Sequence, residues 1–370
     1  MGGNDNINGG GGSNWVSYSA DVFALQENQV LGAVTVDLGA GTATDSYGGT
    51  DTLTNIQNAA GGTLGDALTG SAGDNIFRGF SGNDAINGLG GSDTVDYSRD
   101  EESGRVTFLN GSGAVVVNLT AGTATDGFGN TDTLTSIENA IGTNFNDTLT
   151  GNTANNILTG GLGADTLDGG LGTNTLDGGD GADTASYATA TAGITARLDL
   201  GFGLHSADGL FDTYVGIENV TGSSSNDVLN GLGGVVNVMS GGQGDDIFTG
   251  EGIDVIDGGA GSDVFFGGQG SALNINLATS SIETVWGSFV GDVMDGSTSS
   301  ANLTMVGQGL TGGANADTMM GGSGNDFVYF RAGDIISGGT SGAGGDWAVA
   351  TLSASGVTLN LAATGFENSW

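Results

Sequence analysis

The sequence of 370 residues contains no cysteine, no proline and no lysine, and five arginines carry almost all of its positive charge. Without cysteine, disulfides cannot hold the chain together. Without a basic patch the chain cannot neutralise phosphates, so nucleic acid is excluded as a partner. A run of about 18 apolar residues is also missing, so no membrane-spanning helix is predicted.

Signatures of export and of catalysis are missing as well. The opening residues, Met1-Gly-Gly-Asn-Asp, have neither the charged nor the apolar region of a secretory signal peptide. The sequence has no HExxH, no GxSxG and no Cys nucleophile, and its many GxG sequences lack the strand and helix of a nucleotide-binding unit. We therefore do not expect an enzyme.

What the sequence does contain is glycine and acid. There are 76 Gly, and the 42 acidic residues, 34 Asp and eight Glu, give a net charge of −37. That charge would favour disorder. However, 37% of the residues are hydrophobic, and they recur regularly, as in Leu149, Leu158, Leu167 and Leu176. The pattern indicates a folded chain whose counter-charge comes from outside.

A nine-residue repeat organises the sequence. From Gly142 it reads GTNFNDTLT, GNTANNILT, GGLGADTLD, GGLGTNTLD, GGDGADTAS, with Asp or Asn at position six and an apolar residue at position eight. Glycine in the turn permits positive φ and close stacking of backbones. The three residues around position eight predict a short strand with one inward side chain. Two such units make one flattened coil of about 18 residues, and stacked coils make a parallel solenoid around an aliphatic ladder.

A longer repeat of about 80 residues is superimposed on the short one. Its marker is an apolar–acidic–Asn signal with small variations: Ile56-Gln-Asn, Ile137-Glu-Asn, Ile217-Glu-Asn, Ile282-Glu-Thr and Phe366-Glu-Asn. Thr42 to Thr54, which precedes the first marker, is interpreted as a removable excursion, either an extra coil or a surface loop. We expect one continuous solenoid of five super-repeats, approximately 1–60, 61–141, 142–221, 222–286 and 287–370.

Stacking would place the position-six carboxylates of successive coils about 5–8 Å apart, where they repel by several kcal/mol per pair at an effective dielectric of about 20. Ca²⁺ suits such a groove because it accepts six to eight oxygens at flexible geometry, including backbone carbonyls. Zinc would require His or Cys, and the chain has one His. The predicted calcium ligands are the carboxylates of Asp5, Asp66, Asp84, Asp93, Asp147, Asp165, Asp183, Asp227, Asp246, Asp263, Asp292, Asp317 and Asp326, with the carbonyls of Gly160, Gly178, Gly241, Gly258 and Gly321.

The nonapeptide pattern GGxGxDxUx resembles the RTX family of haemolysin-type calcium-binding repeats. The longer module, with its VxVNLxxGxA, GxxDTLxxIEN and NDxLxG segments, is similar to RTX-rich bacterial surface proteins. The resemblance implies an all-β fold, a right-handed parallel β-roll, several bound Ca²⁺, folding outside the cell and type I secretion. It places the protein at the bacterial cell surface or in the extracellular space.

Three functions fit this resemblance. The first is a structural subunit of a filament, surface layer or matrix, with a cell-surface glycan or another surface protein as a candidate partner. The second is a calcium-rigidified segment of a larger RTX adhesin or toxin. The third is the C-terminal module of a secreted enzyme, which would require a catalytic domain that we do not find in this sequence.

Several residues have a plainer interpretation. Asp45, Asp51, Asp126 and Asp132, all in the excursions, suit tight turns as well as metal binding. His205 is interpreted as a loop residue and not as a ligand. Trp15, Trp286 and Trp347 are expected to cap or fill the core, with an exposed sugar-stacking role as the alternative.

Two further expectations follow from the spacing. Asp147, Asp165 and Asp183 fall on one edge of the coils, and Asn156 and Asn174 on the other. Because an amide brings no charge, calcium is expected mainly on the Asp edge, with an amide ladder opposite. The second expectation is head-to-tail assembly, because Asn58 precedes Asp66 by eight residues, and Asn368 would precede the next copy's Asp5 by seven. The contact would involve Met1, Gly2, Ile7, Phe366 and Trp370.

Overall fold

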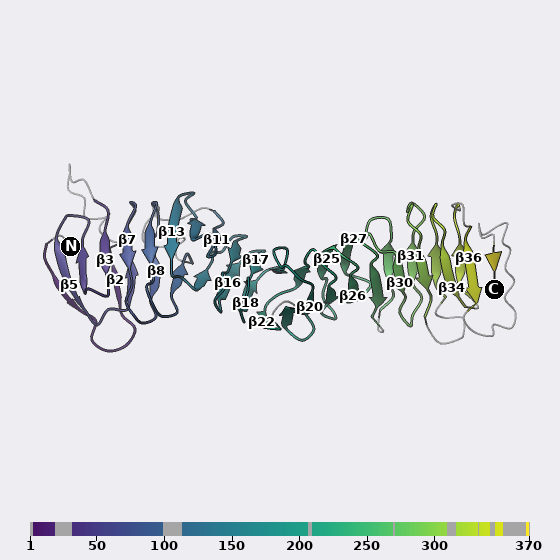
Figure 1. Ribbon diagram of the computed structural model, residues 1–370, viewed down its shortest axis with the longest axis horizontal. Coiled ribbons are helices and arrows are strands. Elements are labelled where there is room, and N and C mark those ends of the chain that lie inside the picture. Colours follow the sequence, from purple (N-terminus) through teal and green to yellow (C-terminus); the bar gives the residue numbers. More distant parts are fainter. Residues whose placement is uncertain are drawn as a thin grey trace. The chain divides into compact units, whose positions relative to one another are not determined.

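The computed structural model describes residues 3–18, 32–98, 113–205, 209–268, 271–308, 316–331, 333–340, 345–350 and 368–369. All regular structure in these ranges is β-strand, and none of it is a helix that could cross a membrane. The chain divides into two compact units, Met1–Ala185 with Phe211–Ile217 and Ser186–Leu210 with Glu218–Trp370. Within each unit, successive strands lie side by side (Figure 1).

The strands are short because each nonapeptide provides only three residues between glycine-rich turns. The middle residue points inward and its two neighbours point outward. Leu149, Leu158, Leu167 and Leu176 are fully buried, one from each of four consecutive strands. The predicted aliphatic ladder is therefore confirmed, as is the β-roll class of the fold.

Unit 1 has two sheets. Strand order in the first sheet is β1 (Asn6–Asn8), β5 (Thr50–Thr54), β4 (Thr42–Thr44), β3 (Thr35–Asp37), β7 (Ala67–Thr69), β9 (Ala85–Asn87), β13 (Thr131–Thr135), β12 (Thr123–Thr125), β11 (Val116–Asn118), β15 (Thr148–Thr150), β17 (Thr166–Asp168) and β19 (Thr184–Ser186). The second sheet is wholly parallel and consists of β2 (Trp15–Ser17), β6 (Asn58–Ala60), β8 (Ile76–Arg78), β10 (Thr94–Asp96), β14 (Asn139–Ile141), β16 (Ile157–Leu162), β18 (Thr175–Asp180) and β22 (Phe211–Val215).

The excursions are antiparallel additions to the first sheet. Strands β3, β4 and β5 form a meander, and so do β11, β12 and β13. Each meander ends with a strand that rejoins the parallel stack, since β5 pairs with β1 and β13 pairs with β9. The segment from Thr42 to Thr54 is therefore an extra part of a coil, one of the two alternatives that the sequence left open.

Unit 2 repeats this architecture. One side is formed by β20 (Ile194–Arg197), β21 (Phe202–His205), β24 (Val228–Asn230), β26 (Ile247–Gly250), β28 (Val264–Gly267), β30 (Thr284–Trp286), β32 (Thr304–Val306), β34 (Phe327–Phe330), β36 (Trp347–Ala350) and β37 (Asn368–Ser369). The other side has β23 (Asn219–Thr221), β25 (Val238–Gln243) and β27 (Val255–Ala260), and further along the chain β29 (Asn274–Asn276), β31 (Val293–Asp295), β33 (Thr318–Met320) and β35 (Ile335–Ser337).

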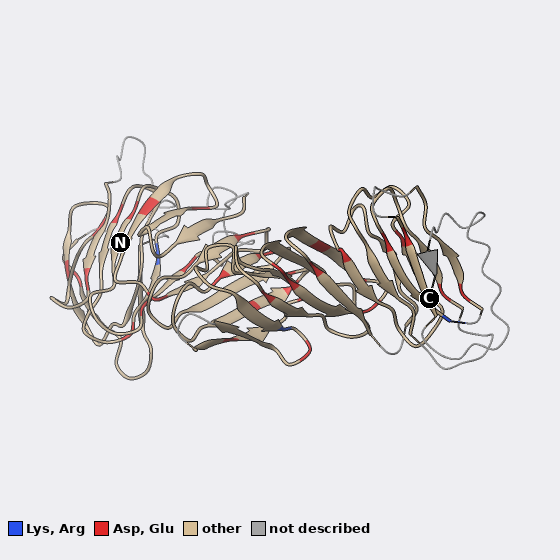
Figure 2. Cartoon of the chain, turned by 45° about the vertical axis from the view of Figure 1, so that its right-hand side comes forward, with Lys and Arg blue, Asp and Glu red and all other residues tan. Residues whose placement is uncertain are grey.

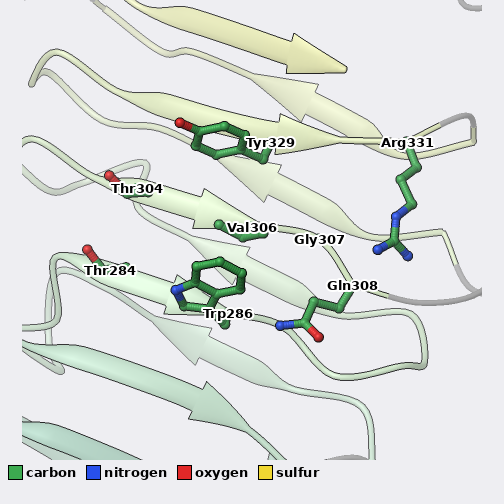
Figure 3. A pocket seen from close by; sticks show the side chains of 8 residues that line it. All are labelled: Thr284, Trp286, Thr304, Val306, Gly307, Gln308, Tyr329 and Arg331. Atoms are coloured by element: carbon green, nitrogen blue, oxygen red, sulfur yellow. The ribbon is translucent and has the colours of Figure 1, made fainter. Parts of the chain in front are cut away.

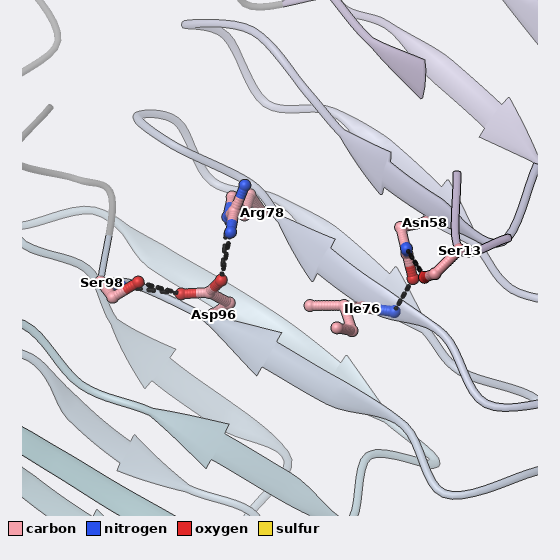
Figure 4. A network of polar contacts seen from close by, with 6 residues as sticks. All are labelled: Ser13, Asn58, Ile76, Arg78, Asp96 and Ser98. Carbon is pink, nitrogen blue, oxygen red and sulfur yellow. Dashed lines mark hydrogen bonds and ion pairs between the residues drawn. The ribbon is translucent and has the colours of Figure 1, made fainter. Parts of the chain in front are cut away.

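The apolar–acidic–Asn signal fixes the register between coils. Asn58 shows how: its amide donates to Ser13 Oγ, and its Oδ1 accepts the backbone N–H of Ile76, both at 2.9 Å (Figure 4). Asn139 and Asn219 accept the N–H groups of Ile157 and Val238 in the same way. Beside this clamp Arg78 pairs with Asp96 at 2.6 Å and lies over the Trp15 ring, 4.2 Å from its centroid.

Candidate metal sites

Acidic residues recur from coil to coil along the chain (Figure 2). We call the stacked position-six residues the carboxylate ladder. In the steps from one aspartate to the next, the backbone N–H of one ladder residue donates to the Oδ1 of the ladder residue in the following coil. Asp147 donates to Asp165, and Asp165 to Asp183, at 2.7 Å; Asp227 donates to Asp246, and Asp246 to Asp263, at 2.8 Å.

The structure places twelve of the thirteen predicted aspartates in buried positions of the ladder. Each has at most 3% of its surface exposed, from Asp66 to Asp326, whereas Asp5 is exposed. Burial of an ionised carboxylate is costly unless both of its oxygens find partners. What each Oδ2 contacts therefore decides what the ladder can bind.

Five carboxylates are closed by their own turns. The Oδ2 of each accepts the N–H of the residue four positions earlier, at position two of the nonapeptide, and in three cases that residue adds a hydroxyl. Thr143 closes Asp147, Ser223 closes Asp227 and Ser288 closes Asp292. Gly62 and Gly322 close Asp66 and Asp326 through their N–H groups.

Five other carboxylates are open. The Oδ2 atoms of these residues are buried and have no hydrogen-bond partner within the described chain: Asp84, Asp93, Asp165, Asp246 and Asp263. In each, the position-two residue has positive φ, which turns its N–H away from the carboxylate: Phe80 (65°), Leu89 (69°), Gly161 (121°), Gly242 (104°) and Gly259 (92°). Phe80 and Leu89 hold this conformation against its steric cost, and such strain concentrates at functional sites.

Glycine at position one leaves room for these carboxylates. A Cβ on Gly241 would collide with Asp246 Oδ2 and crowd the carbonyl oxygen of Gly258. A Cβ on Gly142 would likewise meet Asp147 Oδ2 and the carbonyl of Gly160, and one on Gly222 would meet Asp227 Oδ2 and the carbonyl of Gly241. Three of the five predicted carbonyls thus lie beside ladder carboxylates. The carbonyl of Gly321 lies beside Gly339, and Gly178 packs against the Asp183 side chain and the Gly216 carbonyl.

Sequence reasoning missed the glutamates of the apolar–acidic–Asn signal. Glu138 Oε2 accepts the N–H of Asp93, and Glu283 Oε2 accepts that of Asp263, both at 2.9 Å. Each glutamate therefore occupies the next step of a ladder and faces an open aspartate.

The residue before that signal supplies a carbonyl. A Cβ added to Gly88 would collide with both the Ser136 carbonyl and Asp93 Oδ2, so these two oxygens lie close together. In the same way, a Cβ added to Gly258 would collide with the Ser281 carbonyl and Asp263 Oδ2. Both serines have φ of 50°. Two groups of oxygens result: Asp93 with Glu138 and Ser136, and Asp263 with Glu283 and Ser281.

The excursions also contribute to the ladder. Asp51 and Asp132 are buried, and their Oδ1 atoms accept the N–H groups of Asp5 and Asp84 at 2.8 and 2.9 Å. The sequence could have indicated this role, because Asp51 and Asp132 each begin an Asp-Thr-Leu segment, and the same segment occurs in the nonapeptides. Asp45 and Asp126 instead accept N–H groups of their own turns, from Tyr47 and from Phe128, as turn residues do.

Burial raises the pKa of the open carboxylates. It raises that of Asp84 to about 8, those of Asp165 and Asp246 to about 7, and that of Asp93 to about 6, with neighbouring ladder acids acting in the same direction. Burial likewise raises the pKa of Asp317 to about 7. Without a cation, these positions favour the neutral acid at pH values where aspartate is normally ionised.

Where the ladder residue is asparagine, its own amide makes the hydrogen bonds. Asn156 donates its amide to the Glu138 carbonyl at 2.6 Å, and its N–H donates to Asn174 Oδ1 at 2.9 Å. Asn75 donates in the same way to the Gln57 carbonyl. The amide nitrogen therefore makes the contact that a cation would otherwise make, which agrees with the expected amide ladder.

These donor sets fit a hard, oxygen-preferring cation. Each open site has a buried carboxylate oxygen that lacks a partner, and beside Asp93, Asp246 and Asp263 there is also a backbone carbonyl oxygen. In the described ranges no three His, Cys, Asp or Glu side chains gather to hold a metal, so a bound ion would depend on carboxylates in pairs together with backbone carbonyls. Ca²⁺ accepts such mixed ligands, and Zn²⁺ does not favour them.

A comparison with known families matches the RTX calcium-binding nonapeptide repeat at residues 1–21, 61–95, 141–176, 213–248, 239–271 and 310–334. The chain carries RTX calcium-binding nonapeptide repeats in several copies. The matched segments contain all five open carboxylates, and RTX nonapeptide repeats are calcium-binding. A search of curated proteins finds no match to the chain.

The remaining residues that the sequence analysis singled out lie outside the carboxylate ladder. His205 ends strand β21 and is buried edge-to-face against Tyr187, at 5.4 Å between ring centroids, so its interpretation as a loop residue is wrong. Trp286 is 38% exposed and stacks on Phe266, so it does not fill the core. Ile7 lies in β1 and is partly exposed, whereas Met1, Gly2, Phe366 and Trp370 are outside the described residues.

Proposed function

We propose that this protein is a calcium-dependent structural solenoid of the extracellular space, and not an enzyme. The observation that carries the proposal is the set of five buried, unpartnered Oδ2 atoms, three of which lie beside backbone carbonyls. Filling these positions with Ca²⁺ would neutralise the ladder and replace the missing hydrogen bonds. Asp93 with Glu138, and Asp263 with Glu283, are the sites that we expect to bind most tightly, because each brings two carboxylates together.

The proposed location follows from this chemistry. Extracellular calcium modules bind at about 10⁻⁴–10⁻³ M, so such a chain would gain its counter-charge only after export. RTX repeats are typical of exported proteins, which supports the bacterial surface as its place of action. A rigid spacer within a larger RTX adhesin or toxin would use the same ladder in the same way.

Counting bound calcium tests this proposal. Native mass spectrometry of the wild type should show several Ca²⁺ per chain, and Glu138→Gln should bind at least one fewer. Asp199→Asn is the matched control, since this exposed carboxylate pairs with Arg197 outside the ladder and should leave the count unchanged. An unchanged count for Glu138→Gln, or a wild type that binds no Ca²⁺, would overturn the proposal.

Head-to-tail assembly into a filament is the finer role that we propose. Among the described strands β1 pairs only with β5, and Ile7 on β1 is partly exposed. An unpaired strand edge is a template for another chain. Light scattering in saturating calcium should show polymers for the wild type and shorter species for Ile7→Asp; a wild type that remains monomeric at micromolar concentration would rule the filament out.

A further inference from the structure

An aromatic stripe runs across the outer face of four parallel strands in unit 2. Strand register places Phe266, Trp286, Val306 and Tyr329 in one line across β28, β30, β32 and β34. Their inward neighbours Phe265, Val285, Met305 and Val328 are fully buried, so the stripe itself faces outward. Val306 interrupts it, and a small side chain thus lies between two large rings.

The interruption forms a hollow of about 590 Å³. Trp286 and Tyr329 stand on either side of Val306, two strand spacings or about 10 Å apart, and Figure 3 shows all three on one face. Gln308 and Arg331 reach in from the ends of the strands, and the Thr304 hydroxyl lies at the opposite side (Figure 3). The volume lies within the range of about 300–1,000 Å³ that is typical of small-molecule sites.

The lining has the chemistry of a sugar site. A pyranose has an apolar face of C–H groups, which suits an aromatic wall, and a rim of hydroxyls, which suits amide, guanidinium and hydroxyl partners. A fully aromatic ligand would match Trp286 and Tyr329 but would offer no polar group to the Thr304 hydroxyl or the Gln308 amide. Stacking of Phe266 on Trp286, at 6.1 Å and 30°, helps to hold the indole in place.

The net charge of the chain favours neutral over acidic sugars. The chain carries −37, which repels acidic polymers. The backbone N–H of Arg331 donates to Asp334 Oδ2 at 2.7 Å, so a carboxylate lies beside this arginine. We propose that this hollow binds a neutral hexopyranose unit of a glycan.

The test uses the calcium-saturated protein and saturation-transfer NMR with methyl glycosides of glucose, galactose and mannose, followed by an array of neutral and acidic glycans. At least one neutral sugar should bind, and Trp286→Ala should weaken it about tenfold. Gln308→Ala should weaken it too, and is the milder change if Trp286→Ala disturbs folding. Trp347→Ala is the matched control, because Trp347 stacks on Phe327 outside the hollow and its loss should leave binding intact.

Three results would overturn the inference. The first is that no neutral glycan binds. The second is binding that neither Trp286→Ala nor Gln308→Ala affects. The third is that the hollow instead mediates self-association that Trp286→Ala abolishes.

Discussion

Asp165→Asn should change stability in opposite directions with and without calcium. The pKa of Asp165 lies at about 7 and not at 3.8, because burial and the neighbouring Asp147 and Asp183 disfavour its charge. At about 1.4 kcal/mol per tenfold change in proton affinity, keeping it ionised at pH 8 costs the folded state about 4 kcal/mol. Solvent screening in the groove reduces this to about 2 kcal/mol.

The amide removes that cost in the calcium-free protein. Asn156 and Asn174 show that this fold accommodates amides in its other ladder. We therefore expect Asp165→Asn to lower, by about 2 kcal/mol, the free energy that the osmolyte trimethylamine N-oxide must supply to fold the protein in chelator. In millimolar Ca²⁺ the same variant should unfold at lower urea than the wild type, because it has lost a charged ligand.

Asp147→Asn provides the contrast. Asp147 accepts N–H groups from Val115 and Thr143 with its two oxygens, and an amide can accept with only one. This variant should destabilise the protein in both conditions. If Asp165→Asn has the same sign in chelator and in calcium, the distinction between open and closed carboxylates is wrong.

Three further changes test other parts of the account. Lowering the pH from 8 to 5 in chelator should increase the β content measured by circular dichroism. Acids with a raised pKa, such as Asp84 at about 8, stabilise the fold below pH 4, and this contribution is lost as the pH rises through 7 to 8. A loss of β content on acidification would contradict this. Leu167→Ala should cost about 3 kcal/mol in urea unfolding with calcium, because Leu167 is fully buried, and a cost below about 1 kcal/mol would argue against the stacked core. Gly160→Ala should weaken calcium binding because its Cβ would collide with Asp165, whereas Gly90→Ala, where a Cβ meets nothing within 4 Å, should not; equal affinities would refute the role of position-one glycine.

Much of this fold was predictable because the rule that builds it is local. Every nonapeptide contains its own turn, strand and inward residue, so Leu149 and Leu167 could be assigned to the core without tertiary information. Period-two alternation also places Trp286 outward, next to the buried Val285, and the expectation that it fills the core overlooked this.

The division into open and closed carboxylates was only partly predictable. Thr143 and Ser223 at position two mark closed carboxylates in the sequence. A glycine there does not decide, because Gly161 accompanies an open carboxylate and Gly62 a closed one. Phe80 and Leu89 give no signal in the sequence, because stacking between coils holds them at positive φ against their intrinsic preference. Glu138 and Glu283 join the ladder where an antiparallel excursion or a short connection replaces a regular nonapeptide. Their place in the ladder was not predictable, because the strand pairing there depends on contacts distant in sequence.

The most direct test of the central claim is circular dichroism during a calcium titration of the whole chain at neutral pH. The ladder of buried, like-charged oxygens predicts little β structure in chelator and a cooperative gain as calcium reaches the millimolar range. Equal β content in chelator and in millimolar calcium would contradict the claim that calcium binding builds this structure.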